Sequence, residues 1–329
     1  MVSREDAAAT WDARLLDFAG HSLYQTSRWG EYKNVNGWHA RYLQAEDDGE
    51  VVGMLQPLVR MYPLRTLVAW CPGGPVGSLA VSTADSMRQI AQLSGARALY
   101  CRSTFLRERR EEDEHHLRSH GWSRPDSILS ANETAVWDLR QTEEQLLAGM
   151  NRNWRYSLRQ AEKRGLAIER LSQPPIEELT TLCDSMNVAK GVRASTRAAD
   201  MAALFDALGD RAVVYGCRDD TGQLSAFHSC GIHGDRAWEL VAATSPEGRR
   251  SGASFAVLWA LILHCRSVGL THYDLGGVDA VKAPGVADFK RWTGARDVEW
   301  LGEWEWSTSS LLRRAVDVAV RYRTASTLP

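Results

Sequence analysis

The spacing of apolar residues changes along the chain, and each change predicts a different element. Within Glu5–Ala19 apolar residues recur every three or four positions, which predicts an amphipathic helix. Ala40–Ala45 and Val51–Arg60 flank an acidic turn that ends in glycine, and this pattern is typical of a β-hairpin. A further strand is expected at Leu64–Trp70, and the Gly- and Pro-rich residues 71–75 predict a loop after it.

The second half of the chain repeats this order of signals. We expect two helices, three strands, a loop, a long apolar helix and a strand at residues 176–189, 196–208, 212–218, 224–233, 237–244, 245–252, 253–268 and 272–275. The same order occurs within residues 5–102, so the pattern indicates a duplicated α/β unit. Because 329 residues exceed what one hydrophobic core usually supports, we expect an N-terminal unit over 1–140, a C-terminal unit over 141–310 and a basic tail over 311–329.

Composition narrows the class of protein. The formal net charge of −2 argues against a DNA-binding protein coated in positive charge, so any contact with nucleic acid must come from a local patch. The six cysteines are scattered without a C-x-x-C pair, which favours buried free thiols in a reducing compartment. His228 and His233 are expected on opposite faces of one strand, so we expect no metal site. No segment has the length of a membrane span or the apolar core of a signal peptide, which predicts a cytoplasmic protein.

Positive charge is concentrated after residue 150. Thr142 and Gln145 are spaced as a capping box, which predicts a short helix before this region. In the next helix, steps of three and four place four cations along one face: Arg152, Arg155, Arg159 and Lys163. This face is a candidate for binding RNA phosphates, and the alternative is a solvated surface.

A second anion-binding candidate lies between a predicted strand and the long apolar helix. The segment 246–254 contains Arg249, Arg250 and Gly252, and a helix N-terminus directly after a glycine-containing loop can bind an anion through backbone amides. The alternative interpretation is an ordinary connection with a helix cap.

Three residues near the end of the repeat are candidates for chemistry. Asp274 precedes a glycine pair at a strand end, where it could orient an amine or cap the next turn. Phe289 and Lys290 combine a ring with a cation, which suits a negatively charged group next to a base, or else a surface helix with one aromatic anchor. The sequence shows neither a Gly-x-Ser-x-Gly motif nor a cysteine in a recognisable catalytic setting, so direct transfer is favoured over a covalent enzyme intermediate.

Together these segments resemble the Fem family of peptidoglycan-bridge aminoacyltransferases, whose members carry two GNAT-like domains. The resemblance runs over nearly the whole chain. It rests on Gln25-x-x-x-Trp29-x-x-x-Lys33, Gly74-Pro75-Val76, Val136-Trp137-Asp138-Leu139, the run from Met150 to Gly165, Tyr273-Asp274-Leu275-Gly276-Gly277, and Gly285-Val286-x-x-Phe289-Lys290-x-x-x-Gly294. It implies an α/β fold of two tandem GNAT-like units, with mixed, mostly antiparallel sheets flanked by helices.

The resemblance also implies an activity. Such enzymes transfer an amino acid from aminoacyl-tRNA to an amine, without a cofactor, and the acceptor is a peptidoglycan precursor or a small-molecule natural product. Phe289 is similar to a residue that stacks on the terminal adenine, Lys290 to one that stabilises charge at the leaving ribose, and Asp274 would hold the acceptor amine. Lys33 matches a position that contacts the phosphates of the precursor, with Trp29 and Arg193 assigned to the same acceptor site.

The chain departs from the family in two places. Gly73-Gly74 stands where many members have an arginine, and Trp154–Arg164 passes directly into Leu166–Arg170, which leaves no room for the coiled-coil arm that contacts tRNA in some members. Two alternatives therefore stay open: an acyl-CoA-dependent N-acyltransferase that holds pyrophosphate at 249–254, and a non-catalytic RNA-binding protein that uses 152–163.

The end of the chain predicts an amphipathic helix over Leu311–Arg323. Its apolar residues are Leu311, Leu312, Ala315, Val316, Ala319 and Val320, and its cations are Arg313, Arg314, Arg321 and Arg323. We expect it to rest on the protein itself. The alternative is an anionic membrane surface, bound only peripherally.

Overall fold

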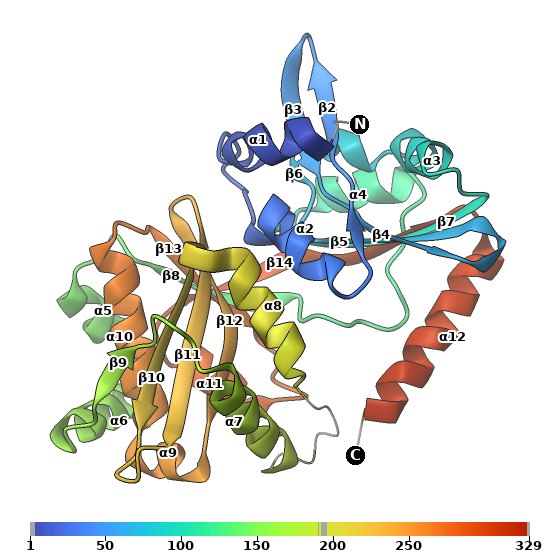
Figure 1. Ribbon diagram of the computed structural model, residues 1–329. Coiled ribbons are helices and arrows are strands. Elements are labelled where there is room, and N and C mark those ends of the chain that lie inside the picture. Colours follow the sequence, from blue (N-terminus) through green and yellow to red (C-terminus); the bar gives the residue numbers. More distant parts are fainter. Residues whose placement is uncertain (1–3, 190, 192–195, 328–329) are drawn as a thin grey trace. The chain divides into compact units, whose positions relative to one another are not determined.

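The computed structural model describes residues 4–189, 191 and 196–327, and the chain divides into two compact units (Figure 1). The N-terminal unit combines Met1–Asn132 with Glu299–Ser326, and the C-terminal unit centres on Glu133–Val298. These bounds differ from the expected 1–140 and 141–310 because of strand pairing. Strand β8 (Glu133–Asp138) pairs with a strand of the C-terminal unit, whereas most of β14 (Arg296–Ser307) pairs with β7 of the N-terminal unit.

The N-terminal unit begins with α1 (Arg4–Leu15) and α2 (Ser27–Asn34). Its larger sheet has the order β1-β4-β5-β7-β14, and its smaller sheet the order β2-β3-β6. The elements not yet bounded are β1 (His39–Ala40), β2 (Leu43–Asp47), β3 (Glu50–Leu55), β4 (Leu58–Tyr62), β5 (Thr66–Pro72), β6 (Val76–Gly77), α3 (Ala84–Leu93), β7 (Ala98–Glu108), α4 (Glu111–Ser119) and α12 (Ser310–Thr327).

The predicted hairpin is confirmed, but its second arm was expected to be one strand and is two. β2 pairs with β3, and the chain then passes to β4, which belongs to the other sheet. Gln56 and Pro57 separate the two strands. The backbone N of Gln56 donates to the side chain of Gln25 at 2.7 Å, and proline has no N–H to donate to a ladder. The strand expected from Leu64 begins at Thr66, because Pro63–Arg65 form a 3₁₀ turn in which Leu64 has a φ of 59°.

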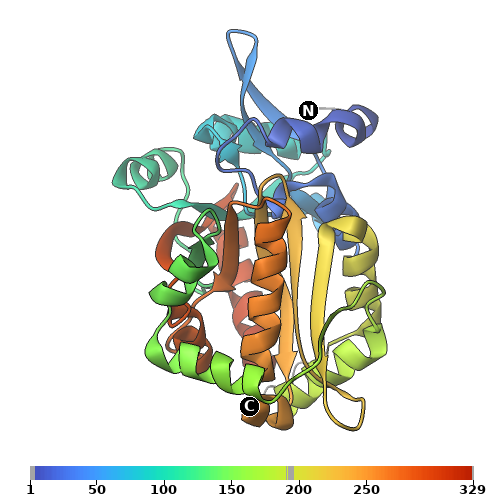
Figure 2. The same cartoon turned by 90° about the vertical axis from the view of Figure 1, so that its left-hand side faces the viewer.

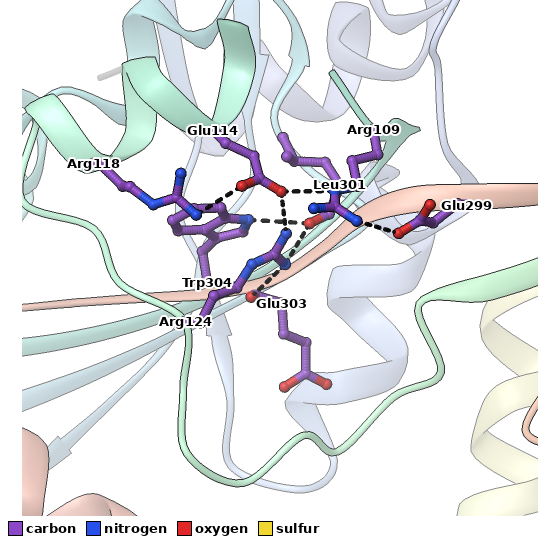
Figure 3. A network of polar contacts seen from close by, with 8 residues as sticks. All are labelled: Arg109, Glu114, Arg118, Arg124, Glu299, Leu301, Glu303 and Trp304. Carbon is purple, nitrogen blue, oxygen red and sulfur yellow. Dashed lines mark hydrogen bonds and ion pairs between the residues drawn. The ribbon is translucent and has the colours of Figure 1, made fainter. Parts of the chain in front are cut away.

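A polar network joins α4 to β14 within the N-terminal unit (Figure 3). The carboxylate of Glu114 accepts from Arg109 at 2.8 Å, Arg118 at 2.7 Å and Arg124 at 2.9 Å. The guanidinium of Arg124 also donates to the carbonyl of Leu301 at 2.6 Å and lies 4.2 Å from the ring centre of Trp304. The carboxylate is thus surrounded by charge-assisted bonds, which are the stronger kind of hydrogen bond.

The terminal helix α12 contacts the N-terminal unit, but the predicted apolar stripe is only partly correct. Leu311, Ala315 and Ala319 of that stripe are exposed, and the contacting side includes the half-buried Arg313 and Asp317. Arg313 pairs with Glu305 at 3.5 Å, and Asp317 accepts from Ser127 at 3.2 Å. Leu311 and Val318 are exposed on its outer side, at 74% and 65%. The side chain of Arg323 lies outside the described residues.

The C-terminal unit has the sheet order β8-β13-β12-β11-β10-β9. Its strands after β8 are β9 (Ile168–Arg170), β10 (Ala212–Arg218), β11 (Leu224–His233), β12 (Arg236–Thr244) and β13 (His272–Gly277). Its helices are α5 (Glu143–Gly149), α6 (Arg152–Lys163), α7 (Ile176–Ala189), α8 (Ala198–Leu208), α9 (Pro246–Ser251), α10 (Ala253–Ser267) and α11 (Pro284–Arg291). The long apolar helix is therefore confirmed as α10, and Figure 2 shows it lying along the sheet.

Both faces of this sheet are covered. Cys230 on β11 belongs to the core beneath α6 and α10, while Phe227 on the same strand belongs to the core beneath α7 and α8. Residues an odd number of positions apart point to opposite faces of a strand, so β11 contributes to both cores. The core beneath α10 contains the fully buried Trp154 and Tyr273.

Candidate functional site

Two neighbouring strands of the C-terminal unit stop pairing part-way along their length. β12 and β13 run parallel and pair at Arg236↔His272, Ala237↔Tyr273 and Trp238↔Asp274. In these two fully described strands no further pair follows, although β12 continues to Thr244 and β13 to Gly277. The residues at the point of divergence are Glu239 on β12 and Asp274 on β13. Backbone groups beyond this point are not used for pairing between these two strands.

Lys290 lies at this point of divergence. It is carried by α11, and its Nζ donates to the carbonyl oxygen of Gly277 at 2.8 Å. Burial lowers the pKa of Lys290, while the negative charges of Glu239 and Asp274 oppose that shift. The ammonium is thus close enough to both carboxyl groups to feel their charge.

Asp274 is buried and bonded within its own turn. Its Oδ1 accepts from the hydroxyl of Thr134 and from the backbone N of Gly276 at 2.8 Å. Burial raises the pKa of Asp274, and the bonds from Thr134 and Gly276 oppose this. The bond to Gly276 is the turn-capping contact that was one of the two interpretations of this residue. Its role in holding an amine stays a prediction.

Phe289 joins Lys290 to the aromatic core. Its ring lies 5.9 Å from that of Trp154 and 5.1 Å from that of Phe255, and it stacks on the imidazole of His228 at 6.2 Å with an angle of 17°. It is therefore more than a surface anchor, since one of its faces covers a histidine. Its stacking on a base stays a prediction.

The structure brings together a series of hydrogen-bonded polar side chains that the sequence did not indicate. His228 Nδ1 lies 2.7 Å from Glu239 Oε1, and His228 Nε2 lies 2.9 Å from Ser254 Oγ. The hydroxyl of Tyr273 donates to the other oxygen of Glu239. Burial raises the pKa of Tyr273 well above its usual value of 10, so its hydroxyl stays a donor at neutral pH. The four residues lie on β11, β12, α10 and β13, and the one available signal was a polar His228 in a largely apolar strand.

The segment between β12 and α10 was expected to be a loop and is a short helix. Ser245 caps α9, because its Oγ accepts from the backbone N of Gly248 at 2.9 Å, and Pro246 occupies the first turn. Gly252 then ends α9 in a left-handed backbone conformation, with a φ of 79°, and α10 begins at the next residue. Arg249 and Arg250 are exposed, and Arg250 pairs with Glu247. Their role in binding an anion remains a prediction.

The basic face of α6 is largely as expected. The side that contacts the core carries Trp154, Leu158 and Ala161. The exposed cations are Arg152, Arg159 and Lys163. Arg155 differs, because it is half-buried and donates to the carbonyls of Leu147 and Ala148 at 3.4 and 3.3 Å. Tyr156 is 63% exposed and lies between Arg152 and Arg159 in the same helical stripe, an aromatic residue that sequence analysis overlooked.

The candidate acceptor residues lie in the N-terminal unit, except Arg193, which is outside the described residues. Lys33 Nζ lies 4.0 Å from the ring centre of Tyr32, 5.0 Å from Trp29 and 5.4 Å from Trp70. The buried Trp29 also makes an edge contact with Tyr24. A cation among aromatic rings is stabilised by their negative faces. Binding of a precursor by these residues stays a prediction.

Gln25, the first residue of the motif that contains Trp29 and Lys33, has a structural role. Its Nε2 donates to the carbonyl of Pro72 at 2.8 Å, and a Cβ added to Gly74 would lie 2.4 Å from its side chain. Gly74 therefore has to be glycine for the loop to pass this side chain. This contact gives a physical reason for the glycine of the Gly74-Pro75-Val76 motif.

The described residues hold no candidate metal site and no membrane-spanning helix, and their cysteines are not joined by disulfide bonds. Within 4–189, 191 and 196–327, no cluster of three or more His, Cys, Asp or Glu side chains could hold a metal ion. None of the described helices has the length and apolar character needed to cross a membrane. All six cysteines are free and buried, as expected.

Comparison with known proteins agrees with this fold. The family described as acetyltransferase (GNAT) domain matches residues 148–291. The lipid II:glycine glycyltransferase of Staphylococcus aureus is 25% identical over 190 residues, which cover 54% of this chain and 44% of that protein. The matched part thus spans less than half the length of these curated relatives.

Solved structures extend the likeness to both units. The crystal structure of FemX has a TM-score of 0.79 at 19% identity and covers 96% of this chain and 99% of its own. A tandem GNAT protein from the clavulanic acid biosynthesis pathway has a TM-score of 0.56 at 14% identity, covering 93% and 96%. The two α/β units are therefore tandem GNAT-like domains, as the sequence predicted. The sequence match to the glycyltransferases and the similarity to FemX agree with the resemblance to the Fem family that the motifs indicated.

Proposed function

We propose that this protein is an aminoacyltransferase that moves an amino acid from aminoacyl-tRNA to the amine of a peptidoglycan precursor. The observation that carries the proposal is the position of Lys290, a cation held at the divergence of β12 and β13 beside Glu239 and Asp274. A preorganised cation in a partly buried setting is suited to stabilise charge that develops on an ester oxygen.

In the proposed reaction the amine attacks the ester carbonyl and the ribose hydroxyl leaves. An activated ester requires positioning and charge stabilisation more than covalent help, so no cofactor is needed. Lys290 would stabilise the leaving oxygen, Phe289 would contact the terminal adenine, and Asp274 would accept a hydrogen bond from the amine. Charged tRNA is a cytoplasmic substrate, so the reaction is proposed to take place in the cytoplasm.

Each unit has a proposed substrate. In the C-terminal unit, the exposed stripe of Arg152, Tyr156, Arg159 and Lys163 combines cations with an aromatic ring, as surfaces that bind single-stranded RNA do. In the N-terminal unit, Lys33 is proposed to contact the phosphates of the precursor, next to Trp29. A small-molecule amine is the alternative acceptor.

An acyl-CoA-dependent N-acyltransferase is the second candidate. The match of residues 148–291 to the GNAT acetyltransferase family favours it, and the α9–α10 segment with Arg249 and Arg250 would hold the pyrophosphate. A non-catalytic RNA-binding protein would use α6 alone and would have no need of Lys290.

The identity of the acyl donor distinguishes these functions. Purified protein is incubated with a lipid II-type precursor and either tRNA charged with labelled amino acids or labelled acetyl-CoA, and the labelled precursor is measured. The proposal predicts label from charged tRNA, with none from uncharged tRNA plus free amino acid. Label from acetyl-CoA alone supports the second candidate. Binding of tRNA without transfer from either donor contradicts both enzymatic functions.

A further inference from the structure

Ser254, His228 and Glu239 are arranged as a hydroxyl, an imidazole and a carboxylate in series. The Oγ of Ser254 lies 2.9 Å from Nε2 of His228, and Nδ1 of the same ring lies 2.7 Å from Oε1 of Glu239. A carboxylate at Nδ1 holds the proton on that nitrogen, so Nε2 presents a lone pair to the serine hydroxyl. A nucleophile in contact with a base that a third group orients is the arrangement that activates serine.

The base and its partner are held rigidly. The side chains of His228 and Glu239 are 7% and 11% exposed, and Phe289 stacks on the imidazole. The hydroxyl of Tyr273 donates a hydrogen bond to the second oxygen of Glu239, and this bond fixes the orientation of the carboxylate. Because few water molecules compete in such a setting, the hydrogen bonds are stronger than at the surface. A rotamer of His228 that breaks both contacts would leave two buried polar groups without partners.

Ser254 differs from the other serines of this region. Ser229 is buried, and its hydroxyl donates to the backbone carbonyl of Val241 at 2.7 Å. Ser251 is half-buried like Ser254, but its hydroxyl donates to the carbonyl of Gly248 at 3.2 Å. A carbonyl cannot accept the proton of a serine during a reaction, whereas an imidazole can. Ser254 combines partial exposure with contact to a base.

We propose that Ser254 is a nucleophile that accepts an acyl group from an activated ester. Its Oγ bonds to the ester carbonyl carbon as its proton passes to Nε2 of His228. The bond to the leaving oxygen then breaks, and that oxygen takes the proton from His228. Water or an amine next attacks the carbonyl carbon of the acyl-Ser254 ester, and His228 receives the proton of the attacking group. The bond between that carbon and Oγ then breaks, the acid or amide product leaves, and His228 returns the proton to Oγ. This activity goes beyond the proposed function, in which the acceptor amine attacks the donor directly.

The test needs neither tRNA nor precursor, so its result is independent of the donor experiment. Full-length protein is treated with phenylmethylsulfonyl fluoride and, separately, with the small ester p-nitrophenyl acetate, and adducts are located by peptide mass spectrometry. We expect one sulfonyl adduct at Ser254 and a burst of nitrophenol with an acetyl group on the same residue. Ser254→Ala should abolish both, and Ser251→Ala is the matched control that should retain them.

The base is tested separately. His228→Gln should slow labelling of Ser254 by roughly a hundredfold or more, the usual contribution of a general base. Glu239→Gln should slow it as well, and circular dichroism checks the folding of each variant. If neither reagent modifies Ser254 in the wild-type protein, or if His228→Gln labels at the wild-type rate while folded, Ser254 is not an activated nucleophile. The contact with His228 then serves only to satisfy a buried histidine.

Discussion

Glu114 is the residue whose replacement tests the packing of the N-terminal unit most sharply. Its side chain is 8% exposed and accepts hydrogen bonds from three arginines (Figure 3). Glu114→Gln keeps the size of the side chain but removes its charge and turns an amide donor toward at least one guanidinium. We expect the variant to fold and to be less stable.

The size of the expected stability loss follows from how exposed the three arginine partners of Glu114 are. Arg109 and Arg118 are 49% and 60% exposed, so water screens their contacts, which contribute little. Arg124 is 32% exposed and is held by Leu301 and Trp304, so its charged hydrogen bond contributes about 1.5–3 kcal/mol. We therefore expect a loss of about 2–3 kcal/mol, below the roughly 3–5 kcal/mol found when a fully buried ion pair is broken.

The loss should depend on pH. Burial of Glu114 would raise its pKa, but the hydrogen bonds from Arg109 and Arg124 outweigh burial and hold the pKa below its usual 4.5. A carboxylate with a lowered pKa stabilises the fold above its unfolded pKa, and this contribution disappears as the pH falls through the folded value. The stability difference between wild type and Glu114→Gln should therefore be full at neutral pH and should shrink below pH 4.5.

Urea unfolding followed by tryptophan fluorescence at neutral and acidic pH measures both effects. The matched control is Glu112→Gln in the same helix, where Glu112 is 73% exposed and pairs with Arg110 at 3.4 Å. We expect the control to change stability by less than about 0.5 kcal/mol. A Glu114→Gln protein as stable as the control at neutral pH would refute the reasoning, and so would a loss that stays constant into acid.

Three further outcomes follow from the structure. Replacing Arg152, Arg159 and Lys163 with glutamine should weaken tRNA binding and reduce its salt dependence, because each phosphate contact releases counterions; an unchanged slope would mean that this face is only solvated. Burial raises the pKa of Asp274 in the folded protein, so the ionised carboxylate lowers the stability of the fold at pH values above the unfolded pKa. Asparagine carries no such charge. In urea unfolding, Asp274→Asn should therefore gain stability relative to wild type as the pH rises from acid to neutral. Because α12 is bonded to the N-terminal unit, the protein should not float with anionic vesicles; flotation that Val318→Glu abolishes would favour the membrane interpretation.

Local patterns predicted the elements that depend on neighbours in sequence. The capping box of Thr142 and Gln145 is present, and α10 begins directly after Gly252. Caps and helical stripes depend on residues three or four positions apart, so the sequence displays them directly. The fold class was predictable for the same reason, since the order of elements repeats along the chain.

Contacts between distant residues could not be predicted in this way. Ser254 and His228 are separated by 26 residues, and their pairing depends on how α10 packs on β11. The division of Val51–Arg60 into two strands depends on the bond between Gln25 and Gln56, which are 31 residues apart. Such pairings are set by tertiary packing, which overrides local spacing.

Single-turnover transfer from charged tRNA to the precursor, measured for Lys290→Ala, tests the central claim most directly. Removing a preorganised charge donor typically costs a hundredfold to a thousandfold in rate, so we expect a loss of about that size with acceptor binding unchanged. Phe289→Ala should instead weaken donor binding, because stacking worth about 1–3 kcal/mol is present in both the ground state and the transition state.

The matched control for Lys290→Ala is Lys282→Ala, because Lys282 is 71% exposed and pairs with Asp279 on the surface. Circular dichroism shows whether each variant is folded. The account predicts that Lys282→Ala transfers at the wild-type rate and that Lys290→Ala does not. A folded Lys290→Ala protein that transfers as fast as the wild type would contradict the assignment of this site to aminoacyl transfer.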